Sequence, residues 1–242
     1  MINKAVILAG GKGTRIANPD MPKAMIKLNG TPILENTLQL LGGCGINEVF
    51  MLVHYLKEQI IGYFGSDFNG MKINYVNVHE ILKYDQPIGI ADVLGVMDGR
   101  INEPFLMILG DEVYAGTKHP DMLKSFNPVY DAMIGVMRTT DERAIKKNYT
   151  LRVDDAFNVT DLEEKPDAPW NDLLGCGTYI FTPKVFDYIR QTPLSAKSGR
   201  REITDTLKVI AANGLLAAFD LGGSYVNINY KEDIALAEKL FK

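Results

Sequence analysis

Near the start of the chain, residues 5–15 read Ala5-Val6-Ile7-Leu8-Ala9-Gly10-Gly11-Lys12-Gly13-Thr14-Arg15. A short apolar run that ends in glycines is typical of a buried strand followed by a loop. Glycine lets backbone N–H groups approach phosphate oxygens closely, and Lys12 and Arg15 add positive charge. The stretch therefore predicts a phosphate-binding loop after the first strand. The plainer interpretation is a glycine turn between a strand and a helix.

The rest of the chain alternates strand-like and helix-like segments. Expected strands cover 5–9, 48–53, 73–78, 105–109, 132–137, 151–153, 158–162, 176–181, 215–219 and 225–228, and expected helices cover 33–41, 56–64, 90–97, 185–189, 202–212 and 233–241. This alternation is that of βαβ units around a parallel sheet. We find neither an internal repeat nor a long linker, so residues 1–242 are predicted to form a single α/β domain. Ligands of such sheets bind at the carboxyl ends of the strands, which makes the segments after Ala9, Leu109 and Ile228 candidates for the site.

Composition excludes several classes of function. A formal net charge of −4 argues against a general nucleic-acid surface, which is normally basic. No apolar run approaches the roughly 18 residues that cross a bilayer, and the opening run is too short for a signal peptide. We therefore expect a soluble, cytoplasmic protein with no membrane partner. Cys44 and Cys176 lack the spacing of a zinc site or a disulfide framework and are predicted to be buried apolar residues.

The glycine loop departs from two common nucleotide-binding motifs. No Gly-Lys-Ser/Thr follows at the spacing of a Walker A loop, and the glycines do not have the GxGxxG order. No acidic residue is suitably placed about twenty residues further on, which disfavours a dinucleotide-dependent oxidoreductase. The three histidines are scattered and form no triad pattern.

Three segments together carry a specific pattern: residues 8–15, then Pro22-Lys23-Ala24-Met25, then Gly30-Thr31-Pro32-Ile33-Leu34. The pattern resembles the sugar nucleotidyltransferase family, and the resemblance extends over nearly the whole chain. It implies a Rossmann-like, mostly parallel central sheet flanked by helices, with a smaller sugar-side sheet. It also implies that Arg15 grips the phosphates and that Lys23 lies at the α-phosphate and the sugar phosphate. The loop residues that would hold the nucleotide are Leu8, Ala9, Gly10, Gly11, Lys12, Gly13 and Thr14.

A metal site is indicated at Asp111, which ends the buried run Leu109-Gly110-Asp111. A carboxylate at the end of a strand suits Mg²⁺, which prefers one or two carboxylates together with phosphate oxygens and water. In the family that the chain resembles, the equivalent Asp contacts both metal and nucleotide. The resemblance implies Asn227 as the second ligand, at a place where many members have Asp. The alternative is that Asn227 only bonds the backbone at the end of a strand.

Sugar recognition is implied for three further segments. Glu163-Glu164-Lys165-Pro166 looks like the family's Glu-Lys-Pro signature, in which Glu164 would bond sugar hydroxyls and Lys165 the sugar phosphate. Without the family, it is an exposed charged strand end. Gly177 lies in a strand similar to the one that lines the sugar pocket, and Arg201 directly precedes a segment that resembles the family's Glu-Ile-Thr-Asp element, from which it could reach the sugar phosphate. Thr150 stands where sugar-specific relatives often carry glycine, and could reshape the pocket.

Base recognition is implied by Gln86-Pro87-Ile88-Gly89-Ile90-Ala91, which resembles a segment of glucose-1-phosphate thymidylyltransferases. There the Gln amide pairs with the pyrimidine edge, and an amide with donor and acceptor suits thymine or uracil. We therefore assign Gln86 and Gly89 to the nucleotide site. The alternative is that Gln86 and Pro87 only precede a helix near Gly89.

The resulting hypothesis is magnesium-dependent transfer from a nucleoside triphosphate, with dTTP or UTP favoured, to a sugar 1-phosphate, with glucose 1-phosphate favoured. An oxygen of the sugar phosphate would attack the α-phosphorus in line, and pyrophosphate would leave. One alternative is transfer to phosphocholine or another phosphomonoester, although those relatives usually have Ala-Ala-Gly at Ala9-Gly10-Gly11. Another is a non-catalytic regulatory subunit that binds nucleotide-sugar, but such subunits tend to lose Lys23 or Asp111. Relatives are often homo-oligomers.

Overall fold

The first strand, β1 (Lys4–Leu8), lies in the middle of a ten-stranded sheet. In this computed structural model, residues 2–13, 15–16, 20–82 and 88–241 are described. β1 pairs in parallel with β4 (Glu48–Val53) and β7 (Phe105–Leu109), and β4 pairs in parallel with β6 (Met71–Asn77). β1, β4 and β7 form central strands because they are largely apolar on both faces, as parallel strands covered by helices require. The parallel centre predicted from the alternating segments is confirmed.

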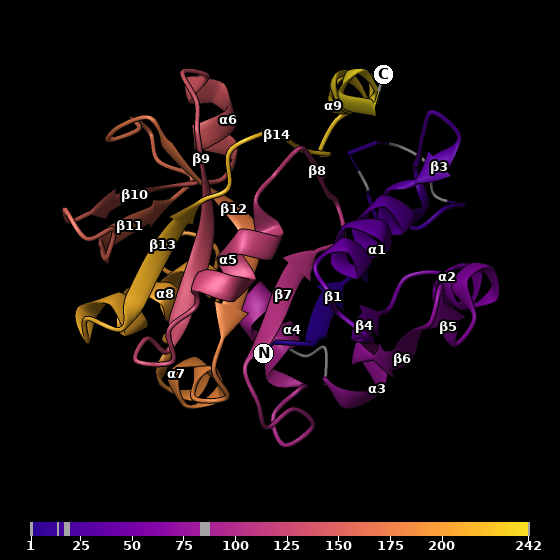
Figure 1. Cartoon of the computed structure of the whole chain (residues 1–242), viewed down its shortest axis with the longest axis horizontal. Coiled ribbons are helices and arrows are strands. Elements are labelled where there is room, and N and C mark those ends of the chain that lie inside the picture. Colours follow the sequence, from indigo (N-terminus) through magenta and orange to yellow (C-terminus); the bar gives the residue numbers. More distant parts are fainter. Residues whose placement is uncertain (1, 14, 17–19, 83–87, 242) are drawn as a thin grey trace.

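Helices cover both faces of this sheet (Figure 1). Ala5 and Ile7 of β1 pack into the cluster that contains the helices α1 (Ile33–Gly43), α2 (Lys57–Phe64) and α5 (His119–Ser125). Val6 packs on the other side, into the cluster with α4 (Ile90–Gly95), α7 (Val185–Gln191) and α8 (Ile203–Ala212). Because side chains alternate along a strand, the single run of β1 supports both layers.

The strands of the second half are continuous with the central sheet. β12 (Leu173–Phe181) is fully buried and pairs antiparallel with β7 near one end and with β10 (Tyr149–Val153) near the other. The remaining strands of this half are β9 (Ala132–Arg138), β11 (Val159–Glu164) and β13 (Leu216–Asp220). The register of β12 against β9 shifts between Gly175 and Tyr179. These strands therefore branch from the central sheet through β12, and the chain forms one α/β fold.

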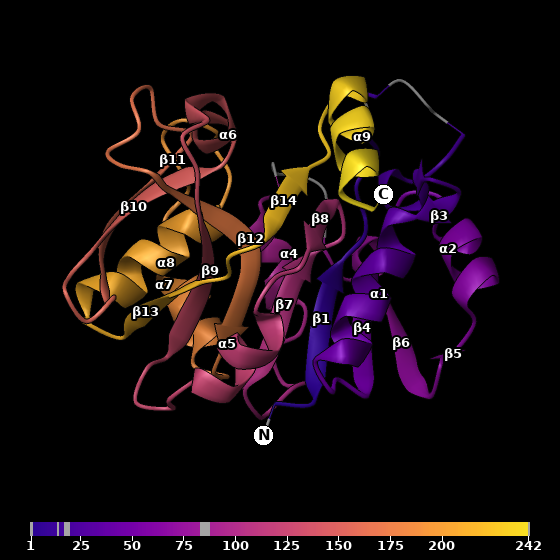
Figure 2. The ribbon, with the colours of Figure 1, turned by 45° about the horizontal axis from the view of Figure 1, so that its top comes forward.

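Two small sheets lie above the carboxyl ends of the central strands. β8 (Glu112–Ala115) pairs with β14 (Ser224–Asn227), and β2 (Lys27–Leu28) pairs with β3 (Thr31–Pro32). Figure 2 shows α9 (Lys231–Glu238) beside β14 and next to these early strands. A third apolar cluster joins these segments, with Val226, Ile228 and Ala237 packed against Ile26 and Leu28. The end of the described chain is thus docked onto the segment that carries Lys23.

The short elements complete the fold. They are η1 (Lys23–Met25), β5 (Asp67–Phe68), α3 (Val78–Ile81), α6 (Glu142–Lys147) and η2 (Lys239–Phe241). Cys176 is buried in β12 as predicted, whereas Cys44 follows α1 and is only half-buried. Among the residues described, none of the helices combines the length and apolarity needed to cross a membrane.

Candidate active site

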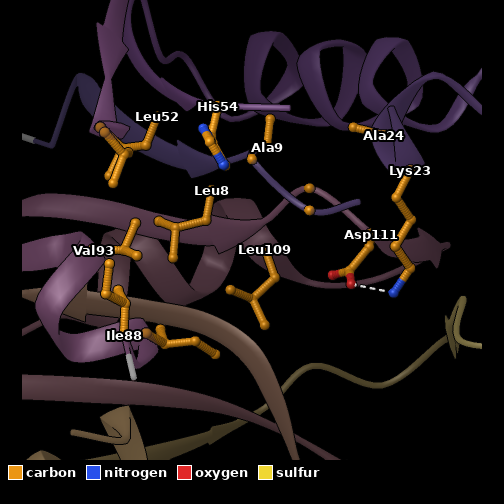
Figure 3. Close-up of a pocket in the computed structure, with 15 residues that line it drawn as sticks. Leu8, Ala9, Lys23, Ala24, Leu52, His54, Ile88, Val93, Leu109 and Asp111 are labelled. Carbon is orange, nitrogen blue, oxygen red and sulfur yellow. Dashed lines mark hydrogen bonds and ion pairs between the residues drawn. The ribbon is translucent and has the colours of Figure 1, made fainter. Parts of the chain in front are cut away.

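A cavity of about 310 Å³ opens at the carboxyl ends of β1, β4 and β7. Its apolar wall is formed by Leu8, Leu52, Val93 and Leu109, and Figure 3 shows Lys23 and Asp111 together at the other end. Ala9, Gly10 and Gly11 line the cavity between these two regions. An apolar wall that leads to a few convergent polar groups is typical of a small-molecule site. This cavity is the candidate nucleotide site.

The glycine loop can pass close to its neighbours because it has no side chains at two positions. A Cβ on Gly10 would lie 3.2 Å from the His54 Cβ, and a Cβ on Gly13 would lie 3.2 Å from the Lys23 Cβ. Gly13 also has a φ of +62°, a conformation that favours glycine. The Lys23 N–H donates to the Gly11 carbonyl at 3.2 Å. The loop and the Lys23 segment therefore form one packed unit, as expected for a loop built to surround a ligand.

Lys12 and Arg15 occupy different positions along this unit. The Lys12 ammonium lies 5.6 Å from the centroid of the Tyr55 ring, and the Lys12 residue is exposed. The Arg15 guanidinium lies 5.9 Å from the centroid of the Tyr230 ring and lines a second cavity. Thr14 lies outside the described residues. The two cations assigned from the sequence thus lie against different aromatic rings.

Lys23 and Asp111 form an ion pair at the end of the first cavity, opposite its apolar wall. The Lys23 Nζ donates to Asp111 Oδ2 at 2.5 Å and to Asn229 Oδ1 at 3.2 Å. Only 11% of the Lys23 side chain and 30% of the Asp111 side chain are exposed. The preceding Gly110 packs against β1, where a Cβ would lie 2.9 Å from the Leu8 carbonyl oxygen. The geometry brings the two residues singled out from distant motifs into direct contact.

A second cavity of about 200 Å³ adjoins the first at Asp111, and we call it the sugar-side compartment after the expectation from the sequence. It shares Ile90, Leu109 and Asp111 with the first cavity, so the two form one cleft with two compartments. The predicted residues Glu164, Lys165, Gly177 and Asn227 all line it. Motifs from β11, β12 and β14 therefore converge on one compartment, although they are far apart in the sequence.

Asn227 is held by a network of amides. Its Oδ1 accepts from Asn229 Nδ2 at 2.8 Å, and its Nδ2 donates to Asn148 Oδ1 at 2.9 Å. Within the described residues, no group of three or more His, Cys, Asp or Glu could hold a metal ion. One carboxylate with amide oxygens nevertheless fits Mg²⁺, because this ion is commonly held by one or two carboxylates together with substrate phosphates and water. Asp111 and Asn227 would hold such an ion, with most of its ligands supplied by the substrates.

Glu112 is a site residue that the sequence motifs did not identify. Its buried carboxylate accepts from the Tyr114 hydroxyl at 2.5 Å, the Tyr225 hydroxyl at 2.6 Å and the Gly177 N–H at 2.8 Å. Burial, with a smaller contribution from the charge of Asp111, raises the pKa of Glu112 to about 7. A Cβ on Gly177 would lie 2.7 Å from Glu112 Oε1, so this close packing requires glycine there. Glu112 thus ties three strands together beneath the sugar-side compartment.

Glu164 and Lys165 lie at the rim of the same compartment. Their carboxylate and ammonium are 3.1 Å apart, and burial raises the pKa of Glu164. Lys165 has a φ of +45°, and its N–H donates to the Asn148 carbonyl at 2.7 Å. A left-handed conformation in a residue other than glycine costs about 1–3 kcal/mol and occurs often at functional sites. The backbone of the Glu-Lys-Pro segment is therefore held in an uncommon conformation, which an exposed charged strand end would not require.

Thr150 points away from the sugar-side compartment. Its hydroxyl accepts from the Trp170 N–H at 3.4 Å, and Thr150 is fully buried. The ring of the preceding Tyr149 lines the compartment instead. We expected from the sequence that Thr150 could reshape the pocket. Its side chain does not line the compartment and therefore does not do so.

The structure does not bring Arg201 and Gly89 into either compartment. Arg201 binds the Asp92 carboxylate and donates through Nε to the Thr192 carbonyl at 2.9 Å. Gly89 precedes α4, where a Cβ would overlap the Arg201 carbonyl. Both residues thus connect α4 to the segment before α8. Gln86 lies outside the described residues.

Asn148, Asn229 and Lys147 also line the sugar-side compartment and were not identified from the motifs. Asn229 lies two positions beyond Asn227, after β14 has ended, and so close in the sequence that it could have been considered with Asn227. Asn148 and Lys147 carry no comparable signal, since they reach the site only through the pairing of β10 with β11 and β12.

Comparison with protein families gives a match to the nucleotidyl transferase model over residues 4–226. The chain is 28% identical over 239 residues to a UTP–glucose-1-phosphate uridylyltransferase, AglF, of Haloferax volcanii, covering 98% of this chain and 95% of the relative. It is 29% identical to a glucose-1-phosphate thymidylyltransferase of Streptomyces griseus over 85% of this chain. It is 27% identical to the bifunctional protein GlmU of Methanocaldococcus jannaschii, of which it spans about half, 53%.

A solved structure described as UDP-glucose pyrophosphorylase complexed with UDP-glucose has the same fold. The TM-score is 0.83 at 23% identity, with 100% of this chain and 98% of the other covered. The family match extends from β1 into β14, and so includes both the glycine loop and the strand that carries Tyr225 and Val226. On the strength of that match, the chain belongs to the nucleotidyl transferase family.

Proposed function

We propose that the protein transfers a nucleotidyl group from a nucleoside triphosphate to a sugar 1-phosphate, forming a nucleotide-sugar and pyrophosphate with the help of Mg²⁺. The single observation that carries this proposal is the Lys23–Asp111 pair at the junction of the two compartments. A cleft with an apolar compartment, a polar compartment and a charged pair between them matches a reaction that joins two phosphorylated substrates.

The reaction forms one bond and breaks another at the α-phosphorus. A phosphate oxygen of the sugar 1-phosphate attacks in line, and the oxygen that bridges to the β-phosphorus leaves as pyrophosphate with the bonding electron pair. Such a transfer needs little covalent chemistry from the protein, because positioning and charge stabilisation supply most of the rate enhancement.

Each charged residue has a part in this scheme. The Lys23 ammonium neutralises charge that develops at the α-phosphate, and Arg15 binds phosphates at the edge of the glycine loop. Lys165 orients the incoming sugar phosphate, while Glu164 accepts hydrogen bonds from sugar hydroxyls. Bound by Asp111 and Asn227, Mg²⁺ would supply Lewis acidity at the phosphate oxygens.

We further propose a pyrimidine nucleotide, with dTTP or UTP favoured, and glucose 1-phosphate. The names of two relatives, a uridylyltransferase and a thymidylyltransferase that both act on glucose 1-phosphate, support this choice. The sequence gives further support, because Gln86 and Pro87 directly precede Ile88. Ile88 lines the first compartment.

The test is pyrophosphate release with Mg²⁺ across a matrix of substrates. The donors are dTTP, UTP, CTP, GTP and ATP, and the acceptors are the 1-phosphates of glucose, N-acetylglucosamine, mannose and galactose, with phosphocholine included. Release that requires both substrates and Mg²⁺ supports the reaction. Release with phosphocholine alone would replace the sugar acceptor, and a folded protein that is silent with every pair would favour a binding role instead.

A further inference from the structure

Lys146 and Lys147 of α6 make different contacts although they are neighbours. Lys146 lies 3.7 Å from Glu142 of its own helix. Lys147 lies 3.3 Å from Asp233 of α9 and lines the sugar-side compartment. Figures 1 and 2 show α6 and α9 at the same end of the molecule, on either side of β14. Lys146 thus pairs within its own helix, whereas Lys147 connects α6 to α9 at the sugar-side compartment.

The side chains of Lys147 and Arg15 both lie against the ring of Tyr230. The Lys147 ammonium lies 5.1 Å from the centroid of the Tyr230 ring, and the Arg15 guanidinium lies 5.9 Å from the same centroid. A ring face attracts a cation within about 6 Å, so the ring orients both groups. Asp233 supplies one negative charge against these two positive ones. These three side chains together carry a net charge of +1, so the region beside Tyr230 favours an anion although the compartment is also lined by the carboxylates of Asp111, Glu112 and Glu164.

Hydrogen bonds connect this group to the Lys23–Asp111 pair. Asp233 Oδ2 accepts from the N–H groups of Asn229 and Tyr230, each at 2.8 Å. The Asn229 side chain in turn accepts from Lys23 at 3.2 Å. The same short segment therefore positions Lys147 on one side and Lys23 on the other. Ligand groups bound at Lys147 and at Lys23 would thus be connected through this segment.

We propose that Lys147 is a further phosphate-binding residue, which binds a phosphate of the substrates in the compartment that Arg15 also lines. The inference rests on the proposed function and deepens it. The Lys147 side chain is 42% exposed, and an ammonium has three donors, so the bond to Asp233 leaves donors for phosphate oxygens. The phosphate is either in the pyrophosphoryl part of the triphosphate or in the sugar 1-phosphate. Both sources present the same chemistry to an ammonium.

The first experiment compares Lys147→Met, Lys147→Arg and Lys146→Met with the wild type. Methionine keeps the length and apolar stem of lysine without its charge, and Lys146→Met is the matched control on the same helix. Binding of magnesium pyrophosphate is measured by calorimetry, and KM is measured for the triphosphate and for the sugar 1-phosphate. Loss of one charged hydrogen bond should weaken binding of the phosphate that Lys147 contacts about tenfold or more. Lys147→Arg should restore most of it, and Lys146→Met should match the wild type.

The two sources of phosphate give different patterns in Lys147→Met. Weaker pyrophosphate binding with a raised KM for the triphosphate assigns Lys147 to the pyrophosphoryl part. A raised KM for the sugar 1-phosphate alone assigns it to the acceptor. Unchanged values for all three ligands would overturn the inference while leaving the proposed function intact. A wild type that neither binds pyrophosphate nor turns over any pair of substrates would overturn both.

A second variant separates phosphate binding from a purely structural role. Asp233→Asn removes the charge that pairs with Lys147 but keeps the lysine. If Lys147 serves only to pair with Asp233, this variant should weaken substrate binding as much as Lys147→Met, and the inference fails. If Lys147 binds phosphate, Asp233→Asn should keep or strengthen pyrophosphate affinity, because the released ammonium has one competitor fewer.

Discussion

The Lys23 ammonium lies 2.5 Å from the Asp111 carboxylate, although the two residues are 88 positions apart in the chain. Lys23 begins η1, which follows the glycine loop, and Asp111 lies two positions after the end of β7. The pair is where the nucleotide-side and sugar-side compartments meet. The two charges of the pair balance each other. In the proposed reaction Lys23 binds the α-phosphate and Asp111 binds Mg²⁺, so both side chains would exchange this contact for a substrate or metal contact.

Removing either charge should abolish most of the activity. Lys23→Met and Asp111→Asn should each lower kcat about a hundredfold or more, because each removes a preorganised charge from the reacting phosphate or its metal ion. Pyrophosphate release at saturating substrate measures the loss, and thermal unfolding checks the fold. Lys27→Met, an exposed residue of β2, is the control and should retain full activity. Near-normal kcat in either site variant contradicts the assigned role.

A second carboxylate at position 227 should strengthen magnesium binding. Asn227→Asp should lower the Mg²⁺ concentration for half-maximal rate about tenfold, equal to roughly 1.4 kcal/mol. The same change puts a carboxylate near Glu112, whose Oε1 now accepts from Asn227 Nδ2 at 3.5 Å. Stability at neutral pH should therefore fall. A magnesium titration and a thermal melt measure the two effects, and an unaltered magnesium dependence would remove Asn227 from the metal site.

Gly177 should not tolerate even one added methyl group. A Cβ there would lie 2.5 Å from Leu109 Cδ1 and 2.7 Å from Glu112 Oε1, so Gly177→Ala should destabilise by about 1–3 kcal/mol and raise KM for the acceptor. Gly62→Ala in α2 is the matched control, because nothing lies within 4 Å of its Cβ. That change should stabilise by about 0.5–1 kcal/mol through helix propensity. Urea unfolding compares the two, and equal stabilities would show that the backbone at 177 can move away.

Arg201 should matter for stability more than for sugar binding. Because its guanidinium is bound to Asp92, Arg201→Met should cost about 1.5–3 kcal/mol of unfolding free energy and leave KM for the sugar 1-phosphate within about twofold. Acceptor kinetics and urea unfolding give the two values. A KM raised tenfold in a stable variant would support the phosphate contact inferred from the sequence instead.

Stability should fall in acid through His119. Burial lowers its pKa from 6.5 to about 4. The unfolded chain therefore takes up a proton at a pH where the native histidine stays neutral. Above pH 6.5 the neutral His119 costs the folded protein nothing. As the pH falls from 6.5 to about 4, the free energy of unfolding decreases through His119 by at most about 3 kcal/mol.

The test for His119 is the pH dependence of Tm. The variant His119→Phe should flatten the fall of Tm between pH 6.5 and 4. Glu112 acts in the opposite direction, because its raised pKa removes stability as pH rises from 4.5 to about 7. A wild type whose Tm changes as little as that of His119→Phe over the acid range would contradict the buried neutral histidine.

The sequence predicted those parts of the fold whose signal is local. β1, β4 and β7 were predicted within one residue, because each is a continuous apolar run between breakers. α5, α6 and β8 were not predicted. Each is at most seven residues long and holds polar residues, and β8 exists only because β14 pairs with it.

The same distinction applies to the site. Lys23 and Asp111 follow from motifs with a strand beside them, and the structure brings them into contact. Glu112 could not be read from the sequence, because its three donors come from β8, β12 and β14 and meet only after folding. The partner of Arg201 was equally hidden, since Asp92 approaches it from a helix 109 positions away.

The contact between Lys23 and Asn229 spans 206 positions of the chain. During synthesis, Lys23 is made long before Asn229, so a nascent chain that has not yet reached Asn229 lacks the side chain that accepts a hydrogen bond from the Lys23 ammonium. The order of the residues along the chain therefore means that Lys23 gains this contact only after the strands and helices between the two residues have been made.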